Sequence, residues 1–374
     1  MERLKKRLLL SSPTMHSEEQ EYIKEAFDTN WIAPLGTNVD EFEKEMCTYV
    51  DINSALALSS GTAALHLAVK LAGVGDGDIV LCSDMTFSAT VNPVSYEGGR
   101  QVFIDSERET WNMDPRALKK AFEKYPDAKA VIAANLYGVP AKLDEIKQIC
   151  DLHNAVFIED AAESLGAVYK GKQTGTFGEY NAVSFNGNKI ITTSGGGMLL
   201  SEDEAAVAKA RFWSTQSREP APWYQHKEIG YNYRMSNIVA GIGRGQLKHL
   251  EEHKGLKTKI YQKYKKGFSD LPVVMNPYLD CSEPNFWLSC ILIDNASAVE
   301  PMEIYENLNE LNIETRPIWK PMHMQPVFSD CDFIYIEDSP VDEEIFKKGL
   351  CLPSDIKMTE QEQDAVIAAV REFF

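Results

Sequence analysis

Short apolar segments alternate with helical segments through the first two thirds of this chain. The apolar segments are residues 79–82, 101–105, 130–134, 155–158 and 182–185. Apolar side chains also recur at helical spacing over residues 62–71, 118–125 and 143–153. Short strands separated by helices predict an α/β fold, in which a mostly parallel central sheet is flanked by helices.

The last third of the chain has a different pattern. A long helix rich in Lys and Glu is expected from 237 to 268. Beyond it we expect strands at 286–293 and 313–318, and helices at 300–311 and 359–374. Because 374 residues exceed one ordinary core, we predict two domains. They are a large domain at 1–250, with an N-terminal lead-in, and a smaller C-terminal α/β domain at 251–374.

Composition excludes several functions. A formal net charge of −18 argues against binding to nucleic acid or to anionic membranes. The N-terminal apolar run is only three leucines, too short for a signal peptide, and no segment is long enough to span a membrane. Seven scattered cysteines without a Cys-x-x-Cys pair favour reduced thiols in a cytoplasmic protein.

Two residues at the ends of predicted strands, an aspartate and a lysine, are candidate catalytic residues. Asp160 follows the strand at 155–158, and Lys189 follows the strand at 182–185. Ligands of parallel sheets bind beyond these carboxyl ends. A lysine can form a Schiff base with pyridoxal phosphate, while an aspartate keeps the pyridine nitrogen of that cofactor protonated. The pair therefore predicts a pyridoxal phosphate enzyme.

Other residues could complete such a site. Ser60, Gly61 and Thr62 precede a helix, where free N–H groups can bind a phosphate, and Ser184 could add a hydroxyl. An ordinary helix N-cap is the alternative. Phe87 could stack on the cofactor ring, although taken alone it is better explained as a core aromatic.

Each member of the pair also has a purely structural interpretation. Asp160 and Glu163 have the spacing of a helix capping box. Lys189 could simply border a strand before the apolar residues that follow it. The functional interpretation is favoured because the phosphate-binding residues, the aromatic ring, the aspartate and the lysine all fall at strand ends.

Two further motifs could suggest other kinds of site, a zinc site and a nucleotide-binding loop. His249-Leu250-Glu251-Glu252-His253 matches the His-x-x-Glu-His zinc motif, but it lies in a helix crowded with Lys and Glu and has no evident further ligand. We therefore interpret it as a solvated helix face and predict no metal site. Residues 195–197 are three glycines without nucleotide-loop spacing, which favours a close backbone approach beside Lys189.

The chain resembles the DegT/DnrJ/StrS family, fold-type I pyridoxal phosphate aminotransferases that act on nucleotide-linked keto sugars. The resemblance runs from about residue 13 to residue 374. The motifs that carry it lie at 31–36, 60–65, 159–162, 184–189, 230–235 and 323–326.

This resemblance implies a role for each matching residue. Lys189 would form the Schiff base and shuttle protons, Asp160 would pair with the pyridinium nitrogen, and Phe87 would stack on the ring. The residues implied at the phosphate are Ser60, Gly61, Thr62 and Ser184, with Asn232 from the neighbouring subunit of a homodimer. The residues implied near the sugar nucleotide are Trp31, Asn186, Arg316, His323 and Gln325.

Glu163 departs from the family pattern, because Gln is common at this position beside the cofactor's ring oxygen. Glu163 is then either protonated through burial or bonded elsewhere. With this Glu and the run Ser-Phe-Asn-Gly-Asn-Lys-Ile-Ile-Thr-Thr at residues 184–193, the chain resembles the branch that makes UDP-linked 4-amino sugars of the bacillosamine type. The implied substrates are UDP-2-acetamido-2,6-dideoxy-4-hexulose and L-glutamate. Alternatives are a 3-keto-sugar aminotransferase, a deoxysugar 3-dehydratase, which carries His at the lysine position, and a non-enzymatic pyridoxal phosphate sensor or partner protein.

Overall fold

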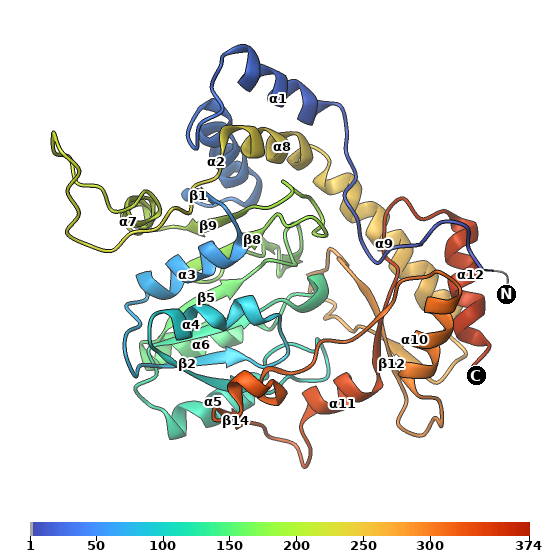
Figure 1. Ribbon diagram of the computed structural model, residues 1–374. Coiled ribbons are helices and arrows are strands. Elements are labelled where there is room, and N and C mark those ends of the chain that lie inside the picture. The colour runs from blue at the N-terminus through green and yellow to red at the C-terminus, as the bar shows by residue number, and fades with distance from the viewer. Residues whose placement is uncertain (1–2) are drawn as a thin grey trace.

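A computed structural model describes residues 3–374 and is built around an eight-stranded sheet (Figure 1). Its strand order is β1-β9-β8-β5-β4-β2-β3-β14. The strands are β1 (Ser54–Leu58), β2 (Ile79–Ser83), β3 (Arg100–Ile104), β4 (Ala130–Ala134), β5 (Val156–Asp160), β8 (Tyr180–Ser184), β9 (Gly197–Ser201) and β14 (Asp332–Ile334). Of these eight, β9 alone pairs antiparallel with both of its neighbours. The predicted α/β fold with a mostly parallel sheet is confirmed.

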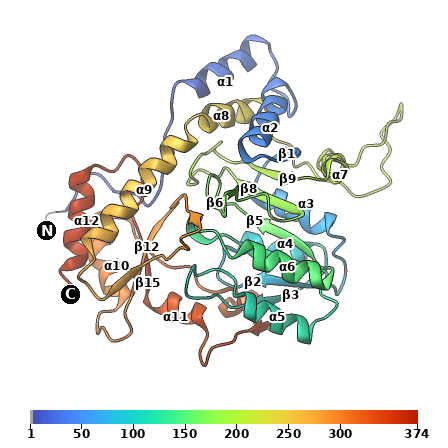
Figure 2. The same ribbon diagram turned by 180° about the vertical axis from the view of Figure 1, so that it is seen from behind.

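Helices cover both faces of this sheet. One face carries α3 (Gly61–Leu71), α4 (Asn92–Tyr96) and α7 (Glu204–Ser214). The other carries α5 (Pro115–Lys124), α6 (Leu143–His153), α2 (Thr37–Val50) and α8 (Asn237–Leu247), the side that Figure 2 turns toward the viewer. A hydrophobic core lies on each face of the sheet, because successive side chains of a strand point to opposite faces. In β2, Val80 and Cys82 pack on the side of α3, while Leu81 packs on the side of α5 and α6.

The predicted helix at 237–268 is two helices, α8 and α9 (Leu250–Gly267), separated by a turn at Lys248 and His249. Helix α8 lies close to α1 (Glu18–Asp28), since a Cβ at Gly245 would stand 2.7 Å from the Glu19 backbone nitrogen. Helix α9 instead packs on the C-terminal sheet. The chain turns between the two helices to make both contacts.

A four-stranded antiparallel sheet forms the C-terminal part. Its order is β10 (Val273–Met275), β12 (Ser289–Ile293), β15 (Gly349–Leu352) and β13 (Arg316–Pro317). Helices α9, α10 (Pro301–Glu310) and α12 (Glu360–Arg371) enclose its core, and α11 (Val341–Lys348) packs nearby. The strands predicted at 286–293 and 313–318 are shorter in the structure. Strand β12 begins only at Ser289, after Phe286 with its positive φ of 50°, and β13 contains only Arg316 and Pro317.

Two segments cross the predicted division at residue 250. Strand β14 pairs with β3 at the edge of the large sheet, and Leu8 forms a bridge with Ile313 of the C-terminal part. A separate small sheet joins β11 (Ser282–Glu283), β6 (Val168–Tyr169) and β7 (Lys172–Gln173). The domain boundary itself stays a prediction.

No helix within residues 3–374 is both long and apolar enough to cross a membrane. The seven cysteines all have free thiols, as predicted.

Candidate active site

A cavity of about 290 Å³ opens where β2, β5 and β8 end and α3 begins. This is the position that a parallel sheet offers to a ligand. The predicted residues that line it are Ser60, Gly61, Thr62, Phe87, Asp160, Glu163, Ser184, Asn186 and Lys189. The structure therefore brings the predicted lysine, aspartate, aromatic ring and hydroxyls into one cavity.

Lys189 projects into this cavity from the loop between β8 and β9, beyond the end of β8 at Ser184. Its side chain is 12% exposed, and its Nζ lies 3.4 Å from Glu163 Oε1. The same Nζ stands 4.2 Å from the ring centroid of Trp287, a cation–π distance. The interpretation of Lys189 as the border of a strand is wrong, because the residue lies in a turn and faces other side chains of the cavity.

Asp160 is the last residue of β5 and is almost fully buried. Its Oδ2 accepts a hydrogen bond of 2.6 Å from Thr90 Oγ1, and its Oδ1 accepts one of 3.0 Å from the Ala162 N–H. Burial raises the pKa of Asp160, while these two donors and the charge of Lys189 lower it. A buried carboxylate held by two donors is suited to face a cationic ring nitrogen.

Glu163 does not form a capping box with Asp160. Residues 162–166 form turns, so no helix begins there, and the capping-box interpretation is wrong. Glu163 Oε2 instead accepts a hydrogen bond of 2.7 Å from the Tyr137 N–H. Burial raises the pKa of Glu163 to about 7, against the opposing charge of Lys189. The structure thus contains both predicted features, a raised pKa and a bond to another group.

Replacing Glu163 should change how stability depends on pH. A carboxyl whose pKa rises on folding stabilises the folded protein at low pH, and this stability is lost as pH rises through the folded pKa. A shift from 4.5 to about 7 corresponds to at most about 3 kcal/mol. Glu163→Gln should therefore unfold at a higher temperature than wild type above pH 7, and the difference should shrink toward pH 5. Glu145→Gln, on the surface helix α6, is the control. A difference that does not vary with pH would contradict the raised pKa.

The start of α3 has the features of an anion site. Ser60 is its N-cap and accepts a hydrogen bond of 3.0 Å from the Ala63 N–H, so the capping interpretation is correct. Gly61 and Thr62 nevertheless line the cavity, at the helix end where N–H groups lack intrahelical partners. A Cβ on Gly61 would lie 2.9 Å from the Ser184 Cβ. Backbone N–H groups and hydroxyls can therefore contact a phosphate at both sides of this corner.

The glycines at 195–197 were predicted to make a close backbone approach beside Lys189. Gly195 and Gly196 do line the cavity with Lys189, but the close backbone approach is made by Gly197 to Ser60 and Gly61. A Cβ on Gly197 would lie 2.3 Å from the Gly61 nitrogen, and one on Gly196 would collide with Thr193 and Met235. Gly195 has open space around it. Gly197 thus lets β9 run against the phosphate corner, whereas Gly196 makes room for the side chains of Thr193 and Met235.

Phe87 is not a core aromatic. Its side chain is 58% exposed, lines the cavity, and lies 5.5 Å from the ring of Trp319. The core-aromatic interpretation is therefore wrong. The ring is available to stack on a planar ligand.

Five predicted residues do not line this cavity. His323 is half-buried, with its Nδ1 at 2.5 Å from Asp84 Oδ2 and its ring stacked on Phe333. Gln325 follows it and donates to the Lys320 carbonyl. The other three are the exposed residues Trp31, Arg316 and Asn232. Their roles stay predictions.

One residue that lines the cavity, Thr90, and two tryptophans that contact lining residues were not predicted from the sequence. Thr90 holds Asp160, and its place four residues after Thr86 in a short polar segment was the only signal for it. Trp287 and Trp319 come from the C-terminal part and place their rings by Lys189 and Phe87. No local pattern marks either tryptophan, because only the tertiary fold brings that part of the chain to the cavity.

The donor set fits pyridoxal phosphate. A narrow corner with N–H groups and hydroxyls suits a dianion, an exposed aromatic ring suits a planar ring, and a buried carboxylate suits a pyridinium. A lysine in the same cavity suits an aldehyde. Fold and site together define the class of protein, a pyridoxal phosphate-dependent aminotransferase.

Comparisons with known proteins give the family. Residues 13–371 match the model of the DegT/DnrJ/EryC1/StrS aminotransferase family, and the chain belongs to it. It is 52% identical to a putative pyridoxal phosphate-dependent aminotransferase, EpsN of Bacillus subtilis, over 99% of this chain and 96% of the relative. It is 34% identical to GDP-perosamine synthase of Caulobacter vibrioides, over 97% of each chain. A solved family aminotransferase from Brucella abortus superposes with a TM-score of 0.87 at 25% identity, over 96% of this chain and 95% of the other. The chain is thus a sugar aminotransferase that depends on pyridoxal phosphate.

Proposed function

We propose that the chain transfers the amino group of L-glutamate to the C4 ketone of UDP-2-acetamido-2,6-dideoxy-4-hexulose. The observation that carries the transamination is the cavity shared by Lys189 and Asp160. Support for a nucleotide-linked sugar comes from the relative named GDP-perosamine synthase. The UDP sugar rests on the bacillosamine-type motif around Glu163 and residues 184–193. The free thiols of all seven cysteines favour the cytoplasm as the compartment.

The residues divide the work of the reaction. When bound, pyridoxal phosphate supplies an aldehyde for the amino group and a ring that withdraws electrons from the carbon that loses its proton. Asp160 keeps a proton on the ring nitrogen, which strengthens this withdrawal. Lys189 Nζ carries the proton away from the α-carbon of glutamate, and later returns a proton on the side of the sugar. Trp287 packs against that amine and limits its access to water.

Glu163 can contribute to the site in two protonation forms. In its protonated form, the carboxyl can donate a hydrogen bond toward a ring oxygen. In its ionised form, it pairs with the Lys189 ammonium 3.4 Å away. Burial raises the pKa of Glu163 to about 7, so in the cofactor-free site both forms are populated near neutral pH.

A dehydratase or a sensor is less well supported. The dehydratases of this family carry His at the lysine position, and this chain has Lys189. A sensor would not need a proton carrier within the cavity beside a buried Asp160. The presence of both Lys189 and Asp160 therefore favours an enzyme that catalyses transamination.

The segment that follows α7 supports a homodimer. It projects away from the body of the molecule (Figure 1) and exposes Trp223, Tyr224 and Ile229 to 65%, 78% and 80%. Such apolar exposure on a projecting arm is typical of a subunit interface. Asn232 lies at the base of this arm, is exposed, and does not line its own cavity. In the homodimer, we assign Asn232 to the cofactor phosphate in the partner subunit's cavity.

A panel of substrates tests the proposed reaction. The purified protein should be yellow, should lose this colour on addition of glutamate, and should then aminate a keto sugar. We expect kcat/KM for the UDP-linked 4-keto sugar to exceed that for its GDP- and TDP-linked counterparts by at least about tenfold. A preference for another nucleotide would contradict the substrate assignment. Absence of any amino product would contradict the proposed reaction as well.

A further inference from the structure

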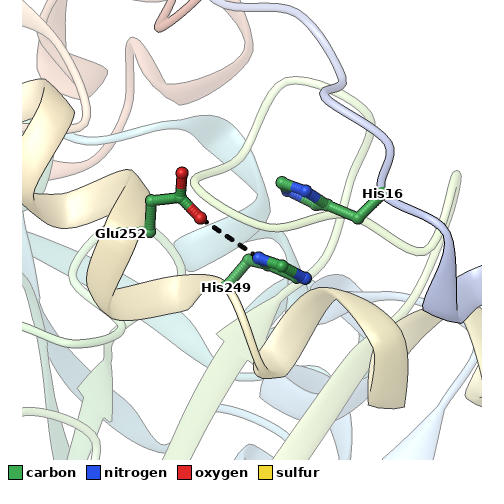
Figure 3. A group of neighbouring side chains, drawn as sticks. All are labelled: His16, His249 and Glu252. Atoms are coloured by element: carbon green, nitrogen blue, oxygen red, sulfur yellow. Dashed lines mark hydrogen bonds and ion pairs between the residues drawn. The ribbon is translucent and has the colours of Figure 1, made fainter.

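Four ionisable side chains gather where the N-terminal segment crosses the turn between α8 and α9. They are His16, His249, Glu252 and His253, and Figure 3 shows the first three. One ligand atom from each of His16, His249 and Glu252 lies within 4.8 Å of the others. The solvated-face interpretation of the His-x-x-Glu-His motif is therefore wrong for its histidines. His249 is half-buried and His253 is 2% exposed, while Glu252 reaches solvent.

The ligand that the motif lacked comes from a distant part of the chain. His16 stacks on His249 with ring centroids 3.5 Å apart. Its backbone N–H donates to Glu19 Oε2 at 2.9 Å, and Gln246 of α8 donates to the other oxygen of the same carboxylate. The buried Glu19 and Gln246 thereby fix the segment that carries His16.

Hydrogen bonds set the protonation of two of the histidines. His253 Nδ1 lies 2.8 Å from the Ile190 carbonyl oxygen, which can only accept. Neutral His253 therefore carries its proton on Nδ1 and accepts at Nε2. His16 Nε2 lies 2.9 Å from that Nε2 and must donate. Neutral His16 is left with an unprotonated Nδ1, a nitrogen that can bind a metal.

Negative charge surrounds His249 on both sides. Its Nδ1 is 3.1 Å from Glu252 Oε2. Its Nε2 is buried without a well-aligned hydrogen bond and lies 3.3 Å from the Glu18 carboxylate. A cation between His249 and Glu252 would replace the proton that the two groups now share, and Glu18 would help to balance its charge.

We propose that His16, His249 and Glu252 bind a divalent transition metal of the Zn²⁺ type. Two imidazoles and a carboxylate match the ligands that Zn²⁺ prefers, whereas Mg²⁺ and Ca²⁺ prefer oxygen alone. Ligand atoms on one zinc lie about 3.4 Å apart, and His249 Nδ1 already lies 3.1 Å from Glu252 Oε2. The third ligand atom, on His16, is within 4.8 Å of the others, and the His16 ring must turn out of its parallel stack on His249 so that both imidazoles can point at one ion. The exposed side of Glu252 gives the ion a path of entry.

The bound metal would have a structural role. It would fasten the N-terminal segment to the first turn of α9, whose His253 holds the carbonyl of Ile190, the residue after Lys189. The site lies outside the cavity that contains Asp160 and requires no chemistry from the metal. This inference does not depend on the sugar substrate.

Calorimetric titration of the metal-stripped holoenzyme with Zn²⁺ tests the site. We expect one ion per chain, and a rise in the unfolding temperature when Zn²⁺ is present. His16→Ala and Glu252→Gln should each weaken Zn²⁺ binding by at least about tenfold and remove the rise. Glu251→Gln is the matched control for Glu252→Gln. Glu251 is the preceding residue, and its carboxylate accepts a hydrogen bond from the Tyr49 hydroxyl.

Two further controls exclude other zinc ligands. His226→Ala removes an exposed histidine, and Cys281→Ser removes the exposed thiol, so neither should change Zn²⁺ affinity. Wild-type affinity in both His16→Ala and Glu252→Gln would overturn the proposal, as would no binding up to about 1 mM Zn²⁺. Wild-type turnover of glutamate in His16→Ala, together with lost Zn²⁺ binding, would support a purely structural metal.

Discussion

Lys189→Ala should lower the rate of transamination at least about 10⁴-fold, because it removes the nucleophile and the proton carrier together. The variant should still bind pyridoxal phosphate. The phosphate corner at Gly61 and Ser184 and the carboxylate of Asp160 remain in place, since Lys189 forms no part of either. Single-turnover assays with glutamate, alongside cofactor titration by absorbance, measure the two effects separately.

Lys24→Ala is a suitable control for this variant, because Lys24 lies on the surface of α1 and pairs with Asp28. It should keep wild-type activity. Substantial turnover in Lys189→Ala would contradict the assignment of the catalytic amine. Loss of cofactor binding as well would show that Lys189 holds the site together rather than carrying the proton.

Asp160→Asn should reduce turnover by about 10²–10³-fold, since a neutral amide cannot stabilise the protonated ring nitrogen. Stability should respond in the opposite sense. Burial raises the pKa of Asp160, so the ionised carboxylate is costly in the folded protein without cofactor. The cofactor-free variant should therefore unfold at a temperature equal to or above that of the wild type, while its kcat with glutamate falls.

Thr90→Val is the graded companion to this variant. It removes the hydroxyl that donates to Asp160 Oδ2 at 2.6 Å but leaves the charge. The expected fall in kcat is about tenfold, the cost of one hydrogen bond to a charged group. Equal losses in the two variants would mean that position, and not charge, makes Asp160 important.

Much of the fold and part of the site could be predicted from local sequence. The strand at 130–134 and the helix at 143–153 have the predicted bounds, because apolar runs and helical spacing are local signals. Asp160 and Lys189 could be predicted because residues beyond the carboxyl ends of neighbouring parallel strands, here β5 and β8, lie close together. Gly61 could be predicted because it precedes a predicted helix, where free N–H groups can bind an anion.

The remaining features depend on contacts between distant segments. Trp287 reaches Lys189 from the C-terminal part, and His16 reaches His249 from the N-terminal segment. Neither pair has a fixed spacing that a motif could record. The break between α8 and α9 was missed for the same reason, because the two helices pack on different partners while the sequence keeps its helical character.

The central claim is that the amine of Lys189 carries the cofactor aldehyde. Reduction of the yellow holoenzyme with borohydride makes that linkage permanent, and mass spectrometry of the digested chain then locates it. We expect the phosphopyridoxyl group on the peptide that contains Lys189 and on no other peptide. Its attachment to another lysine, such as the buried Lys257, with Lys189 unmodified, would contradict the proposed chemistry of the site.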